Sequence, residues 1–239
     1  MIKVNTWGRL GNNLFQYATG RILAEALGYK LEAKTFPQFK NMIEVRGVEV
    51  NEPVTTINYI ASSAAPGGYC DPDYTLDSLV KLAPCKFVFN TFCVKSSFVE
   101  PHKTKICEWF DIPNGFSPHQ DDIVLHARLT DFVTLGWELQ EAHYLGILNS
   151  QTWRQKYLCT DDANHPLIRK LQKAGCQIVP GDEFETFKFI KSFNNIAIAS
   201  TFSWWAAFLS GASRIYMPSK VNFWATGILK MNESRYIYV

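Results

Sequence analysis

From residue 121 onward, five short apolar segments alternate with longer amphipathic ones, and this alternation constrains the fold more than any other feature of the chain. Short apolar segments separated by helix-length connections are typical of parallel strands joined by crossover helices. Residues 121–239 are therefore predicted to form a doubly wound α/β domain of the nucleotide-binding type. The predicted strands are IVLHARL, KYLCT, CQIVP, NIAIA and RIYMP, and the predicted helices are EAHYLGIL, HPLIRKLQKAG, DEFETFKFIKSF and FSWWAAFLSG.

Residues 1–120 begin with a strand followed by a helix, but the alternation of strands and helices is lost after residue 36. IKVNT reads as a strand, WGRLGNN as a glycine-containing loop, and LFQYATGRILAEALG as a helix that ends at Gly28. KLEAK and KFVFNTF are further strand candidates, whereas the rest of residues 36–120 has few clean periods. We expect a reduced amino-terminal α/β lobe, with a boundary near residue 120.

Composition excludes several classes of partner. Lys plus Arg number 24 against 22 Asp plus Glu, so the net charge of +2 gives no general attraction to nucleic acid or to a membrane surface. The six cysteines form no CxxC pair, and the acidic pairs at 121–122 and 161–162 are adjacent rather than spaced as DxD. Neither a signal peptide nor an apolar run of about 18 residues is present. We expect a cytoplasmic protein without a resident metal or cofactor, a nucleic-acid partner or a membrane span.

The ends of the predicted strands identify a candidate site, because ligands of parallel sheets bind beyond the carboxyl ends of the strands. Arg128 stands near the end of one apolar strand and shares a strand face with His126. Three strand ends carry polar residues: Thr130-Asp131, Asp161-Asp162 and Ser200-Thr201-Phe202-Ser203.

Ser200, Thr201 and Ser203 stand where a strand turns into a helix. The N–H groups of a helix start carry partial positive charge, so this turn is a candidate anion site, with Trp204 and Trp205 anchoring the helix in the core. The alternative is an ordinary helix cap.

The planar guanidinium of Arg128 suits a diphosphate, because it donates two parallel hydrogen bonds. Arg128 could instead pair with Asp131 or Asp122, and His126 could be a core histidine.

Four segments carry a family resemblance, in the same order along the chain. Residues 126–131 (HARLTD) resemble the H-x-R-x-G/T-D motif of fucosyltransferases, and residues 200–207 (STFSWWAA) resemble the S-S/T-F-S-W-W-A motif of the alpha-1,2 family, glycosyltransferase family 11. Residues 8–18 (GRLGNNLFQYA) are similar to that family's first motif, and residues 157–162 (YLCTDD) to its strand end before an acidic pair. The chain departs from family 11 at Thr130, where Gly is usual, and at Asn13, where Gln is usual.

This resemblance implies the GT-B architecture, in which two Rossmann-like lobes face a cleft, with the nucleotide sugar in the lobe at 121–239 and the acceptor on the lobe at 1–120. It implies a GDP-fucose donor, a glycan acceptor, and metal-independent transfer with inversion. Arg128 would hold the diphosphate, supported by the turn at 200–203, which includes Phe202. The remaining residues implied at the site are Gly11, Asn12, Asn13 and Gln16 from the amino lobe, and Asp161 and Asp162 beside the nucleotide.

The general base is left open between two residues. Asp131 is preferred to His126, because a carboxylate becomes more basic when it is enclosed. Asp131 could also form an ion pair with Arg128 or Arg9. Two other functions share these features: transfer from another GDP-sugar or from UDP-xylose, and a non-catalytic module that binds a sugar nucleotide or a glycan.

Overall fold

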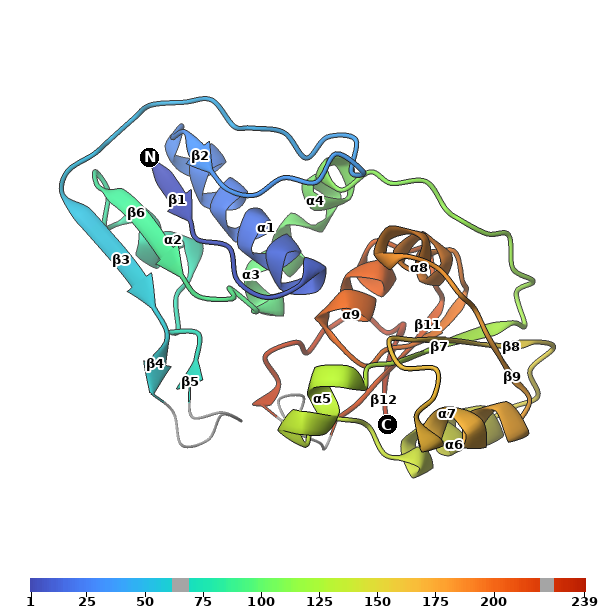
Figure 1. The fold of residues 1–239 in the computed structure, drawn as a ribbon. Helices are drawn as coiled ribbons and strands as arrows, with labels where there is room; N and C mark the ends of the chain where they lie inside the picture. The colour runs from blue at the N-terminus through green and yellow to red at the C-terminus, as the bar shows by residue number, and fades with distance from the viewer. Residues whose placement is uncertain (62–68, 220–225) are drawn as a thin grey trace. The chain divides into compact units, whose positions relative to one another are not determined.

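The computed structural model describes residues 1–61, 69–219 and 226–239, which form two compact units (Figure 1). The first unit comprises Met1–Ile112 and Ile228–Met231, and the second comprises Pro113–Gly227 and Asn232–Val239. Each unit contains its own parallel sheet. The chain is therefore an α/β protein with two parallel sheets, as expected for its fold class.

The second unit contains a six-stranded sheet in the order β12-β11-β10-β7-β8-β9. Every pair of neighbours is parallel. Numbered within the unit, this is the order 6-5-4-1-2-3, which is that of a dinucleotide-binding Rossmann fold. The strands are β7 (Ile123–Ala127), β8 (Lys156–Thr160), β9 (Cys176–Ile178), β10 (Asn195–Ala197), β11 (Arg214–Met217) and β12 (Tyr236–Tyr238).

Helices cover both faces of this sheet. In Figure 1, α8 and α9 lie on one face, and α6 and α7 lie on the other. All five predicted strands and all four predicted helices of this region are present, but α5 and β12 were not predicted. The helices are α5 (Thr130–Leu135), α6 (Glu141–Asn149), α7 (Pro166–Lys173), α8 (Glu183–Lys191) and α9 (Thr201–Phe208).

Helix α9 is held in the core by its aromatic side chains. Trp204, Trp205 and Phe208 are fully buried. The ring of Trp204 stacks on that of Phe208 with centroids 4.9 Å apart and meets Trp205 edge-on at 5.1 Å. The predicted anchoring role of the two tryptophans is confirmed.

The first unit contains a four-stranded sheet in the order β2-β1-β6-β3, with all neighbours parallel. Helix α1 packs on β1 and against α2 and α3. A short two-stranded antiparallel pair, β4 and β5, extends beyond β3. The elements are β1 (Ile2–Val4), α1 (Leu10–Leu27), β2 (Leu31–Glu32), β3 (Val54–Asn58), β4 (Ile60–Ala61), β5 (Tyr69–Cys70), α2 (Leu76–Val80), β6 (Lys86–Asn90), α3 (Ser96–Val99), the 3-10 helix η1 (Glu100–His102) and α4 (Lys103–Trp109).

Helix α1 begins earlier than the sequence predicts. The predicted loop included residues 10–13, but these residues form the first turn of the helix. The chain turns instead at Gly8, whose φ of +73° is a conformation that favours glycine. The predicted end is confirmed, since Gly28 adopts the left-handed conformation after Leu27.

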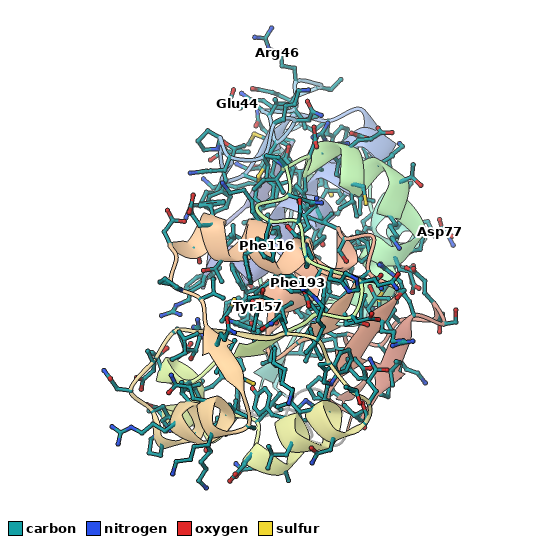
Figure 2. The ribbon with its side chains drawn as sticks, turned by 90° about the vertical axis from the view of Figure 1, so that its right-hand side faces the viewer. Glu44, Arg46, Asp77, Phe116, Tyr157 and Phe193 are labelled. Atoms are coloured by element: carbon teal, nitrogen blue, oxygen red, sulfur yellow. The ribbon has the colours of Figure 1, made fainter. Side chains whose placement is uncertain are left out.

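The segment before β7 belongs to the second unit, although it was expected in the first lobe. The N–H groups of Gly115 and Phe116 each donate to Ser192 Oγ at 3.1 Å. The ring of Phe116 stacks on Phe193 and meets Tyr157 edge-on. Figure 2 labels these three side chains. These contacts attach the segment to the end of α8 and to β8.

Candidate functional site

The site is built at the topological switch point of the second sheet. Strands β7 and β10 are neighbours, and the chain continues from them toward opposite edges of the sheet. Ligands of doubly wound sheets bind outside the carboxyl ends of the strands at this point. Arg128 directly follows β7, and Ser200 lies three residues after β10. The strand order therefore brings both predicted segments to the expected edge.

Arg128 forms ion pairs with two carboxylates. Its Nη2 lies 2.7 Å from Asp131 Oδ1, and its Nη1 lies 3.0 Å from Asp161 Oδ2. Its guanidinium carbon also lies 5.7 Å from the centre of the Phe132 ring. The alternative pairing with Asp131 is thus present. The pairing with Asp122 is wrong, because buried Asp122 binds Arg154 through both carboxylate oxygens.

Asp161 connects the ends of β7 and β8. Its Oδ1 accepts hydrogen bonds from the N–H groups of Leu129 (2.8 Å) and Thr130 (3.4 Å), and its Oδ2 accepts one from the Thr130 hydroxyl (2.6 Å). Burial would raise the pKa of Asp161, but these hydrogen bonds and the charge of Arg128 outweigh burial and lower it. Asp161 is therefore ionised at neutral pH and fixes the start of α5.

Asp131 is more exposed than we expect from its sequence. Its side chain is 50% exposed to solvent, whereas the side chain of Asp161 is 20% exposed. The expectation that Asp131 is enclosed is wrong, because it lies in the first turn of a short surface helix that was not predicted. Asp131 instead accepts from the Thr130 hydroxyl at 3.3 Å and pairs with Arg128.

At the start of α9, the Ser203 hydroxyl is directed inward. Ser203 is fully buried, and its Oγ accepts from the N–H groups of Ala199 (3.0 Å) and Ser200 (3.2 Å). Ser203 therefore shapes the turn. We expected its hydroxyl to face a ligand, but the hydroxyl points into the core. The first N–H to donate to a carbonyl of the helix is that of Trp204, to Ser200 at 2.9 Å. The N–H groups of residues 201–203 precede this ladder, and Thr201 and Phe202 are half-buried.

His126 joins β7 to this turn. Its Nδ1 lies 3.0 Å from Ser203 Oγ, and its ring centre lies 5.5 Å from that of Phe202. Burial lowers the pKa of His126 to about 4, so the imidazole is neutral at pH 7. These contacts make His126 a positioning residue, which connects the strand carrying Arg128 to the start of α9.

Asp162 has a local role. Its Oδ1 accepts from the Asn164 N–H at 3.0 Å, and its own N–H donates to Thr160 Oγ1 at 3.2 Å. The residue organises the turn between β8 and α7, and it lies outside the ion-pair network of Arg128, Asp131 and Asp161.

The amino-lobe residues of the predicted site are mostly engaged inside the first unit. Asn13 Nδ2 donates to the Trp7 carbonyl at 2.8 Å, and Gln16 Nε2 donates to the Thr91 carbonyl at 2.9 Å. Both side chains are buried, Gly11 is buried and Asn12 is half-buried. Asn13 and Gln16 therefore fix the loop between β1 and α1, and their part in shaping a cleft stays a prediction.

The sequence placed Thr130 at a polar strand end of the candidate site but gave it no role of its own. Its hydroxyl and its N–H both donate to Asp161. A strand followed by Thr-Asp is a helix-start signal that could have indicated α5.

The described residues offer neither a metal-ligand cluster nor a membrane-spanning helix. Across residues 1–61, 69–219 and 226–239, no three His, Cys, Asp or Glu side chains are grouped as metal ligands. In the same ranges, no helix combines the length and the apolar character that crossing a bilayer requires.

No protein-family model and no curated protein matches the chain. Solved structures similar to it include fucosyltransferase NodZ from Bradyrhizobium, at 13% identity and a TM-score of 0.47, covering 90% of this chain and 93% of that one. NodZ alpha-1,6-fucosyltransferase co-crystallized with GDP is similar at 14% identity and a TM-score of 0.46, with the same coverage. NodZ alpha-1,6-fucosyltransferase soaked with GDP-fucose is similar at 13% identity and a TM-score of 0.44, covering 90% of this chain and 93% of that one. These are similarities of overall fold at low sequence identity.

Proposed function

We propose that this protein is a glycosyltransferase that transfers fucose from GDP-fucose to a hydroxyl of a glycan, with inversion and without a metal ion. The observation that carries the proposal is the position of Arg128 and of the α9 start at the switch point of a Rossmann-order sheet. Positive charge from a guanidinium and from helix N–H groups is what a leaving diphosphate requires. The four family-like motifs favour GDP-fucose as the donor over another GDP-sugar or UDP-xylose.

Binding of the diphosphate requires an exchange of partners at Arg128. The two carboxylates and one guanidinium carry a net charge of about −1 between them, which would repel a diphosphate if all the contacts stayed as they are. Asp131 is the carboxylate that can leave, because it is half-exposed, and exposed ion pairs contribute little to stability. Asp161 is braced by Thr130 and Leu129, and it keeps Arg128 at the strand end.

The transfer step then uses groups that are already at the site. An acceptor hydroxyl attacks the anomeric carbon of fucose, the bond from that carbon to the β-phosphate oxygen breaks, and GDP leaves with the bonding electrons. Arg128 and the α9 N–H groups stabilise the charge that develops on the leaving oxygen. Asp131, released from Arg128, accepts the proton of the acceptor hydroxyl.

Release of GDP from GDP-fucose, measured with and without a panel of glycan acceptors, tests this function. Arg128→Ala should lower the rate by about 100- to 1,000-fold, because one stabilising group of this kind contributes about 3 kcal/mol to the transition state. Arg169→Ala, an exposed arginine on α7 of the same unit, should leave the rate unchanged. A near-normal rate in Arg128→Ala would contradict the proposal, and binding of GDP-fucose without turnover would indicate a non-catalytic module.

A further inference from the structure

Three adjacent strands of the first sheet end in the same chemical pattern. Asn-Thr-Trp (5–7) follows β1, Asn-Thr-Phe (90–92) ends β6, and Asn-Tyr (58–59) ends β3. The strands are neighbours in the order β1-β6-β3, so the three asparagines meet at one edge of the sheet. Each asparagine is followed within two residues by an aromatic side chain.

The asparagines form a continuous row of amides. Asn5 Nδ2 donates to Asn90 Oδ1, and Asn90 Nδ2 donates to Asn58 Oδ1 at 2.8 Å. This direction leaves an acceptor, Asn5 Oδ1, at one end of the row and a donor group, Asn58 Nδ2, at the other. Asn58 is exposed, and the other two are half-buried, so the row borders solvent. We call Asn5, Asn90 and Asn58 the amide row.

An exposed indole lies two residues after Asn5 of this row, on a backbone held by hydrogen bonds. Trp7 is 52% exposed, although its N–H donates to Gln16 Oε1 at 3.3 Å and its carbonyl accepts from Asn13 Nδ2. The next residue, Gly8, approaches Phe92 so closely that a Cβ at Gly8 would lie 3.3 Å from its ring. Phe92 in turn meets the ring of Tyr59 edge-on at 5.3 Å. The aromatic residues that follow the three strands therefore belong to one surface region.

This region has the position of a ligand site. The amide row lies at the carboxyl ends of three neighbouring parallel strands, which is the edge where ligands of such sheets bind. The second sheet holds Arg128 between two carboxylates at the corresponding edge, whereas the amides and aromatic rings of this row are uncharged. A row of uncharged amides and rings is suited to a neutral ligand.

We propose that the amide row and Trp7 bind a neutral saccharide. Sugar hydroxyls are both donors and acceptors, and they match the donor and acceptor ends of an amide row. The C–H face of a pyranose ring is apolar and packs on an exposed indole. The role of this saccharide as the acceptor of transfer rests on the proposed function, but its binding does not. A nucleobase, which also stacks and binds amides, is the competing ligand.

Saturation-transfer NMR on the full chain tests the site, with maltotriose, cellotriose and N-acetyllactosamine at millimolar concentration, and with guanosine as the competing probe. At least one neutral saccharide should receive saturation from the wild-type protein. Trp7→Ala should weaken its binding by about tenfold or more, since the stacking surface is lost. Asn58→Asp should also weaken binding, because it keeps an acceptor for Asn90 but removes the outward donor. Leu82→Ala, which is 52% exposed in the same unit, is the matched control and should change nothing.

The outcomes separate this site from the proposed transferase activity. Absence of binding by all three saccharides, or undiminished binding in both Trp7→Ala and Asn58→Asp, would overturn the inference. Displacement of the saccharide by guanosine would assign the site to a nucleobase instead. Arg128→Ala should leave saccharide binding intact, and Trp7→Ala should leave the thermal shift produced by GDP intact, so either proposal can fail alone.

Discussion

Arg128 lies between two carboxylates that differ in their exposure to solvent. The Asp161 side chain is 20% exposed and accepts from two N–H groups and a hydroxyl, whereas the Asp131 side chain is 50% exposed. We therefore expect a ligand that competes for the guanidinium to displace Asp131 more readily than Asp161. In the proposed mechanism, Asp161 keeps Arg128 at the end of β7 and the displaced Asp131 accepts a proton.

His126 makes the stability of the protein depend on pH. Its pKa in the folded protein is about 4, and an exposed histidine has a pKa near 6.5, so between these values the unfolded chain binds a proton that the folded chain does not. Stability is therefore complete above about pH 6.5 and falls as the pH decreases toward 4, by about 3 kcal/mol from this residue. His126→Gln should reduce this slope, measured by urea unfolding across that pH range. Burial lowers the pKa of His143 in the same way, so His143 also makes stability fall with decreasing pH. The His126→Gln variant should therefore show a smaller slope of stability against pH than the wild type, but not a slope of zero.

An exposed leucine provides the control for this measurement. Leu82→Ala should retain the slope of the wild type, because the substitution removes no titratable group from a side chain that is 52% exposed. A His126→Gln slope equal to that of the wild type would mean that the imidazole is not buried in its neutral form.

At the scale of elements, α9 depends on its two tryptophans. Trp204→Ala should lower the free energy of unfolding by about 3 to 5 kcal/mol, because the side chain is fully buried and stacked on Phe208. Trp7→Ala removes the same side chain from an exposed position and should change stability by less than about 0.5 kcal/mol. Chemical denaturation of both variants checks this difference. Equal losses would show that Trp204 is not a core residue.

The elements that the sequence predicts well are those buried on both faces. Strand β7 is buried at every position, so it appears in the sequence as a continuous apolar run. Strand β3 lies at a sheet edge, alternates between exposed and half-buried residues, and gives no such run. The start of α1 was missed because Gly11, Asn12 and Asn13 are poor helix formers, and the bonds of Asn13 and Gln16 to distant backbone groups stabilise it instead.

The candidate site was predictable only in part, for a related reason. The residues at the strand ends follow from the alternation of strands and helices, and the structure places Arg128 and Ser200 just beyond β7 and β10. The Ser203 hydroxyl, besides its local bonds to the N–H groups of Ala199 and Ser200, meets His126, which lies 77 residues away along the chain. Arg128 likewise meets Asp161 only through the pairing of β7 with β8. Contacts of this kind are set by the sheet, and no local pattern encodes them.

At the scale of the whole molecule, the two units share an α/β architecture but differ in the side chains at their strand ends. Each unit has a parallel sheet with polar residues at the carboxyl ends of neighbouring strands. The second unit presents a guanidinium, two carboxylates and a helix start, whereas the first presents amides and aromatic rings. With a net charge of only +2, the selectivity that we propose for a charged donor and a neutral acceptor would have to come from these local groups.

The central claim is that Arg128 and the start of α9 together bind the diphosphate of a nucleotide. Hydrogen–deuterium exchange of the full chain, with and without GDP, tests it most directly, because the N–H groups of residues 201–203 precede the helix ladder. We expect GDP to slow exchange in peptides that cover residues 128–131 and 199–204. Bound GDP that leaves both segments unchanged, or that protects only the first unit, would contradict the claim.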